Sequence, residues 1–148
     1  MTTASTPAPG TTTAGRTLVS RLDSMGDVLL AGPAVAALAG LGPVDMLCSH
    51  IGEQAAQLLP GVEDVLVFDA AWVLRDAPPI DANAISGLVT AISARGYARA
   101  AILTSSHQSA LPLALVLRLA GIPEIAAVSL DYPGRRPHER MTAGGRST

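Results

Sequence analysis

Acidic, basic and hydroxyl side chains gather within a short segment near the start of this 148-residue chain. The segment holds Arg21, Asp23, Ser24 and Asp27, so that a cation, two carboxylates and a hydroxyl group lie close together in sequence. A carboxylate such as Asp27 can take the proton from a hydroxyl group as that hydroxyl attacks a carbon atom, which is general-base catalysis. The segment is therefore a candidate catalytic site.

The same residues also fit a purely structural role. Ser24 and Asp27 have the spacing of a capping box, with Asp in place of the more usual Glu or Gln. An acidic residue in the first turn of a helix is stabilised by the helix dipole in any case. Because caps are far commoner than catalytic bases, the spacing alone favours a cap.

A second polar cluster, Thr-Ser-Ser-His-Gln-Ser, occupies residues 104–109. The side chains of His107 and Gln108 could form hydrogen bonds with hydroxyl or phosphate groups of a ligand, and a helix start there would offer free backbone N–H groups to an anion. Ser105 and Gln108 again have capping-box spacing. Both interpretations, ligand binding and capping, stay open for this cluster.

Strand-like and helix-like segments alternate along the chain and would position both clusters. We predict strands at residues 17–22, 44–48, 64–68, 100–104 and 124–129, and helices at residues 27–41, 51–59, 81–95 and 108–120. Pro33 either kinks the first helix or starts its second segment. Continuous apolar strands that alternate with helices indicate an α/β fold, a Rossmann-like parallel five-stranded sheet with helices on both faces.

In such a sheet ligands bind at the carboxyl ends of the strands. The turn at residues 21–27, called the first turn below, follows the first predicted strand, and the 104–109 cluster follows the fourth. We therefore expect the two segments to approach each other at the carboxyl ends of these strands. The glycine pattern G-x-G-x-x-G is absent from the first turn, which counts against a dinucleotide-binding oxidoreductase. Cys48 and His50 have no companions at metal-ligand spacing, so we predict no zinc site.

The composition limits the class of protein further. The chain has ten basic residues, all arginine, against twelve acidic ones, for a net charge of -2, which does not suggest a nucleic-acid partner. One cysteine, Cys48, cannot form an internal disulfide and fits a reducing compartment such as the cytoplasm. We expect a disordered leader over residues 1–16, one domain over residues 17–132, a disordered tail over residues 133–148, and no transmembrane helix.

Three stretches of the sequence resemble the amino-terminal half of glycosyltransferase family 9, the ADP-heptose:lipopolysaccharide heptosyltransferase family. They are RLDSMGDVLLAGPAV, LLPGVEDVLVFDAAWV and AILTSSHQSALPLALVLRLAGIPEIAAVSLDYPG, and S-M-G-D-V-L is the most specific part. The resemblance runs from about residue 17 to residue 134. It implies the amino-terminal, acceptor-side domain of a GT-B glycosyltransferase, in which two Rossmann-like domains face each other across a cleft.

The resemblance also implies roles for individual residues. Asp27 would be the general base of an inverting sugar transfer that needs no covalent intermediate, no cofactor and no bound metal. The acceptor-binding residues would be Arg21, Asp23, Ser24, Met25, Gly26, His107 and Gln108. Because Asp27 lies in the most specific part of this family pattern, the resemblance favours a catalytic role for Asp27 over a purely structural role as a helix cap.

Family members continue into a second domain that binds the nucleotide-sugar donor, whereas residues 133–148 do not resemble that continuation. We therefore expect a chain that transfers sugar to a glycan or glycolipid acceptor only together with a donor domain. A lipid-linked acceptor would bring it to the inner face of the membrane. The alternative is a non-catalytic binding or regulatory module that kept the fold and lost the chemistry.

Overall fold

A five-stranded parallel sheet forms the centre of the computed structural model, which describes residues 15–129. The strand order is β3-β2-β1-β4-β5. The elements in chain order are β1 (Thr17–Arg21), α1 (Met25–Leu30), α2 (Gly32–Ala39), β2 (Val44–Cys48), the 3-10 helix η1 (His50–Gly52), α3 (Glu53–Leu58), β3 (Val62–Val67), α4 (Ala82–Ser93), β4 (Arg99–Thr104), α5 (Leu111–Leu119) and β5 (Glu124–Ser129). All but the last two residues of the predicted leader, and the whole predicted tail, lie outside the described residues.

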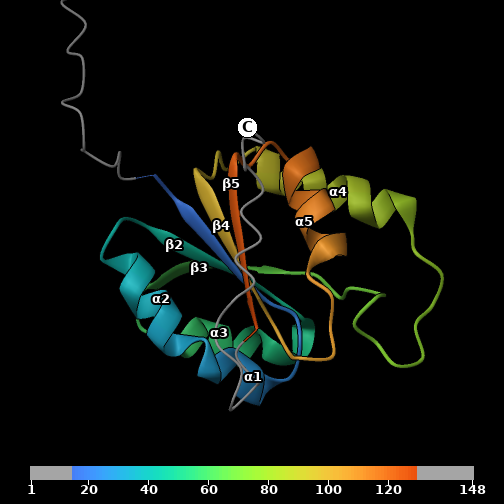
Figure 1. Cartoon of the computed structure of the whole chain (residues 1–148), viewed down its shortest axis with the longest axis horizontal. Helices are drawn as coiled ribbons and strands as arrows, with labels where there is room; N and C mark the ends of the chain where they lie inside the picture. Colours follow the sequence, from blue (N-terminus) through green and yellow to red (C-terminus); the bar gives the residue numbers. More distant parts are fainter. Residues whose placement is uncertain (1–14, 130–148) are drawn as a thin grey trace, which may run out of the picture.

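Helices cover both faces of the sheet, as predicted. Figure 1 shows α1, α2 and α3 on one side and α4 and α5 on the other. Alternate residues of β1 enter the two resulting cores: Leu18 packs in the cluster that includes α4 and α5, and Val19 in the cluster that includes α1, α2 and α3. Every residue of β1 and β2 is buried, including the polar residues Thr17, Ser20 and Arg21 of β1 and Asp45 of β2.

Three predicted helices differ from the observed ones. The single helix predicted at residues 51–59 consists of η1 followed by α3. The single helix predicted at residues 27–41 is divided at Ala31 into α1 and α2, and Pro33 lies in the first turn of α2, where its missing N–H costs no hydrogen bond. The helix predicted from residue 108 begins only at Leu111. Pro112 lies in its first turn, and the Ser109 hydroxyl accepts a hydrogen bond from the Leu111 N–H at 3.2 Å.

The capping box predicted at Ser105 and Gln108 is therefore wrong. Ala110 is the N-cap of α5 and makes no side-chain cap bond. Residues 105–108 instead form a turn, in which the backbone N–H of Gln108 donates to the carbonyl oxygen of Ser105 at 3.2 Å. This turn frees the Gln108 side chain for other contacts.

A buried carboxylate joins the elements at the amino ends of the strands. Asp45 of β2 is completely buried and accepts hydrogen bonds from the Tyr97 hydroxyl at 2.6 Å, from Arg16 at 2.7 Å and from Arg95 at 3.2 Å. Arg95 also pairs with Asp64 of β3. The cluster connects the segment before β1 with β2, β3 and the end of α4, far from the carboxyl ends of the strands.

The Tyr97 phenol in this cluster should make stability fall in alkaline solution. Burial, and then the hydrogen bond to Asp45, raise the pKa of Tyr97 well above its ordinary value of 10.0. Above pH 10 the unfolded chain loses this proton while the folded chain keeps it, so the stabilisation present below pH 10 is lost as the pH rises. Urea unfolding at pH 8 to 11 should show a steeper decline for the wild type than for Tyr97→Phe, and parallel curves would contradict this.

No helix within residues 15–129 combines the length and the apolar character needed to cross a bilayer.

Candidate functional site at the carboxyl ends of β1 and β4

The winding of the sheet changes direction between its two central strands. The chain proceeds from β1 outward through β2 to β3, and then returns to place β4 and β5 on the opposite side of β1. The loops that follow β1 and β4 leave the sheet at this change of direction. In sheets of this kind, the ligand-binding crevice lies at the carboxyl ends of these strands. Both polar clusters found in the sequence lie in these two loops.

Asp27 forms the predicted capping box with Ser24. The Ser24 hydroxyl accepts a hydrogen bond from the Asp27 N–H at 3.3 Å, and Asp27 Oδ2 accepts from the Ser24 N–H at 3.3 Å. The Ser24 hydroxyl also donates to Asp27 Oδ2, at 2.8 Å. These contacts fix the carboxylate at the start of α1, so the structural role of Asp27 is confirmed.

The guanidinium group of Arg21 contacts both carboxylates of the turn, Asp23 and Asp27. Its side chain is completely buried, and Nη2 lies 3.4 Å from Asp23 Oδ2 and 3.2 Å from Asp27 Oδ1. The Asp27 side chain remains 30% exposed, and a carboxylate has about four lone-pair positions. Asp27 can thus hold its cap and its ion pair and still accept a hydrogen bond from a hydroxyl group in the crevice.

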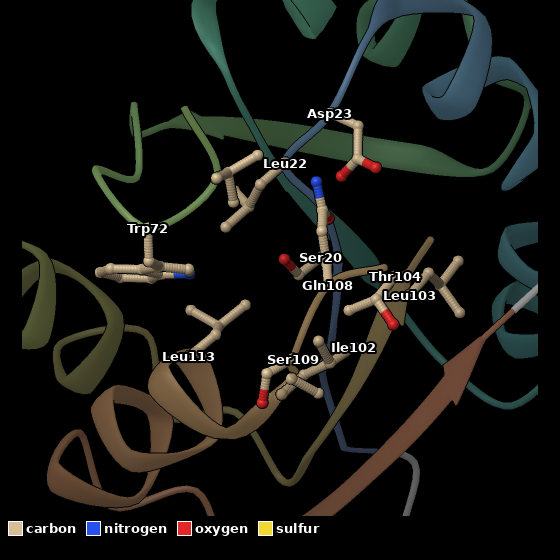
Figure 2. A pocket seen from close by; sticks show the side chains of 12 residues that line it. Ser20, Leu22, Asp23, Trp72, Ile102, Leu103, Thr104, Gln108, Ser109 and Leu113 are labelled. Carbon is tan, nitrogen blue, oxygen red and sulfur yellow. The ribbon is translucent and has the colours of Figure 1, made fainter. Parts of the chain in front are cut away.

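The two loops meet through Asp23 and Gln108. With the Gln108 amide oriented so that both groups gain a partner, its nitrogen donates to Asp23 at 3.1 Å from Oδ1 and 3.2 Å from Oδ2. Figure 2 shows the two side chains pointing toward each other above the end of β1. The expectation that the 104–109 cluster approaches the first turn is confirmed by this contact.

A small cavity lies beneath Asp23 and Gln108. Figure 2 shows Ser20 near its centre, with Trp72 and Leu113 at the opposite end from Asp23. The Ser20 side chain is buried, and its hydroxyl has no hydrogen-bond partner among the described residues. The cavity measures about 10 Å³, room for about one water molecule. The cavity is therefore too small for an organic ligand.

Trp72 contacts both the cavity and the core. It is partly buried against the cluster under α4 and α5, and its ring centroid lies 6.0 Å from that of Phe68. Trp72 therefore has a packing role in addition to its place in the cavity wall.

The remaining predicted acceptor-binding residues lie at the surface of the two loops. Met25 is 40% exposed, Gly26 is exposed, and His107 is exposed on the 105–108 turn and does not line the cavity. A Cβ atom at Gly26 would come within 4 Å only of the Ser24 hydroxyl, at 3.8 Å. The fold itself does not require glycine at this position, although a ligand that approaches the backbone would.

Sequence reasoning missed a pair of residues at the same edge of the sheet. His50, at the start of η1, and Asp69, after β3, are hydrogen bonded through the imidazole ring and through the His50 backbone. Ser49, the preceding residue, donates from its hydroxyl to the Asp23 carbonyl oxygen at 3.0 Å. The pair is 19 positions apart in sequence, and no local pattern marks it.

Cys48 has the inert environment that its position in β2 predicts. Burial, and then the nearby carboxylates of Glu53 and Asp69, raise the pKa of the Cys48 thiol to about 11. The thiol is therefore protonated at neutral pH and is not an activated nucleophile. Across residues 15–129, no three His, Cys, Asp or Glu side chains come together as metal ligands.

The sheet order, the two helical layers and the crevice between β1 and β4 define a Rossmann-like α/β domain. Its fold resembles solved glycosyltransferases. A family 9 glycosyltransferase from Veillonella parvula matches 78% of this chain with a TM-score of 0.60 and 17% sequence identity. The Escherichia coli ADP-heptose lipopolysaccharide heptosyltransferase II matches 76% of it with a TM-score of 0.57 and 19% identity.

This chain covers only 32% and 30%, respectively, of those two proteins. Neither the protein-family models nor the curated sequences gave a match. The predicted resemblance to family 9 and the predicted Rossmann-like sheet are confirmed at the level of the fold.

Proposed function

We propose that this chain is the acceptor-side domain of an inverting glycosyltransferase of the heptosyltransferase type. The observation that carries the proposal is the contact between Asp23 and Gln108, which brings the Asp27 turn and the 105–108 turn together over one crevice. A partly exposed carboxylate, hydroxyl groups and an amide converge there, and such groups suit the hydroxyl-rich surface of a sugar.

In the proposed mechanism the acceptor hydroxyl lies against Asp27. The carboxylate takes the proton as the hydroxyl oxygen attacks the anomeric carbon of a nucleotide-sugar, the new glycosidic bond forms, and the bond to the diphosphate breaks. Arg21 holds Asp23 and Asp27 in place from within the core. The charge that develops on the diphosphate must be stabilised by groups from a second, donor-binding domain.

Exposed apolar side chains beside the crevice support a second domain. Met25, Leu29 and Leu30 of α1 are 40%, 52% and 63% exposed. Several large exposed apolar side chains on one short helix next to a polar site are typical of an interaction surface. A donor domain packed against α1 would cover it and would exclude water from the reaction.

Transfer should therefore depend on complementation. The full 148-residue chain, mixed with the part of the E. coli heptosyltransferase that it does not match, should transfer sugar from ADP-heptose to a glycan acceptor, and the chain alone should not. Product formation is measured by mass spectrometry. A folded chain that supports no transfer with any family 9 donor domain would favour the non-catalytic module, in which Asp27 serves only as a cap.

A further inference from the structure

The His50–Asp69 pair lies at the same edge of the sheet as the proposed acceptor site but plays no part in the mechanism above. His50 Nδ1 lies 2.9 Å from each oxygen of the Asp69 carboxylate. The His50 backbone N–H also donates to Asp69 Oδ1, at 3.0 Å. One carboxylate thus fixes both the backbone and the ring of His50.

This geometry determines what the other ring nitrogen can do. An Nδ1–H that donates to Asp69 leaves Nε2 of the neutral ring as an acceptor, because the partner of one nitrogen sets the tautomer of the other. The side chain of His50 is 67% exposed, so the ring is accessible to a ligand. The Asp69 carboxylate is in turn held by these bonds, which lower its pKa.

The position of the pair connects it to the crevice. His50 follows Ser49, whose hydroxyl is bonded to the Asp23 carbonyl oxygen, and η1 packs against α1. The packing is close, since a Cβ atom at Gly52 of η1 would lie 2.7 Å from Val28 Cγ2. These contacts hold the backbone of His50 close to the turn that carries Asp23 and Asp27.

The charges nearby favour a neutral ligand group. Glu53 and Asp69 are carboxylates close to His50 and would repel a phosphate or carboxylate, whereas Asp23 and Asp27 are paired with Arg21. A neutral hydroxyl group can instead donate to Nε2 without this penalty.

We propose that His50, positioned by Asp69, forms a second hydroxyl-binding subsite on the β2–β3 side of the crevice and holds a sugar hydroxyl other than the one that reacts. The inference rests on the proposed function, since it concerns the same acceptor. Asp69 is a positioning residue: it acts through the ring of His50 and does not touch the sugar.

Histidine NMR of the full chain tests the subsite. With uniform ¹⁵N labelling, which reports on the imidazole rings and the backbone amides together, His50 should show the Nδ1–H tautomer in the wild type, and Asp69→Ala should show a mixture of tautomers. Methyl mannoside, a neutral sugar probe, should shift the His50 Nε2 resonance saturably, and Asp69→Ala should weaken the apparent affinity about fivefold, the effect of one hydrogen bond. Glu63→Gln, at the other end of the strands, should change neither result.

The outcomes separate this inference from the proposed function. Shifts in residues 23–27 without a shift at His50 would overturn the subsite and leave the proposed function intact. A shift at His50 without one in residues 23–27 would support the subsite and contradict an acceptor held over Asp27. A response of His50 to inorganic phosphate but not to the sugar, or no response of any residue to the sugar, would overturn the subsite.

Discussion

Asp27→Asn should abolish most sugar transfer in the complemented protein, with a loss of about 10²- to 10⁴-fold, the usual contribution of a general base. Asparagine has nearly the same shape as aspartate, and its amide oxygen can still accept the hydrogen bonds from Ser24. The substitution therefore removes the proton acceptor and keeps the start of α1. The rate of transfer from ADP-heptose under saturating acceptor is the measurement.

Two controls decide what such a loss means. Glu63→Gln removes an exposed carboxylate at the amino end of β3, away from the crevice, and should leave transfer unchanged. Urea unfolding of Asp27→Asn should show a decrease of about 1–3 kcal/mol, because the capping group is retained but the ion pair with the buried Arg21 is lost. Transfer equal to the wild type in Asp27→Asn would make Asp27 a helix cap and nothing more.

The ion pair between Asp27 and Arg21 means that stability and transfer must both be measured for Asp27→Asn. Because Arg21 is completely buried, Asp27→Asn also removes one of the negative groups that face its guanidinium. If transfer falls and stability falls strongly as well, then loss of the local structure explains the result. If transfer falls while the variant stays folded under the conditions of the assay, then loss of the proton acceptor explains the result.

The strands could be predicted from the sequence because short runs rich in apolar and β-branched residues, bounded by turn residues, mark them. Residues 44–48 and 124–129 were predicted at the observed bounds, and the other strands within two residues of theirs. The exact helix starts were harder to predict because several start signals competed. At α5 the serine of a capping pattern at Ser105 suggested one start, whereas Pro112 in the first turn and the Ser109 hydroxyl determine the observed one.

The site could be predicted in part. The meeting of the two loops follows from their places after parallel strands, and Asp23 and Gln108 confirm it. Partners that only the tertiary structure brings together could not be found: Asp69 approaches His50 from another strand. Asp45 lies in the run Val-Asp-Met-Leu-Cys, which gives no sign that its carboxylate is the centre of a buried cluster.

Asp45→Asn tests that cluster and should have the largest effect on stability among single substitutions of its residues. Asp45 is completely buried and accepts from Tyr97, Arg16 and Arg95, whereas an amide in its place would present an N–H₂ group to at least one of these donors. Removing one partner of a buried ion pair costs about 3–5 kcal/mol. The arginine side chains are about one-third exposed and can be rehydrated, so we expect a loss of about 2–4 kcal/mol.

Urea unfolding measures this loss as a lower midpoint with an unchanged slope. The free energy of unfolding of a domain is only about 5–15 kcal/mol in total, so the variant should be close to the limit of stability. Glu63→Gln, which removes the exposed second partner of Arg16, should cost less than about 1 kcal/mol. Equal losses in the two variants would mean that burial of Asp45 adds nothing, and that the cluster is no stronger than a surface ion pair. Because the cluster lies at the amino ends of the strands, Asp45→Asn should reduce transfer only in proportion to the unfolded fraction, unlike Asp27→Asn.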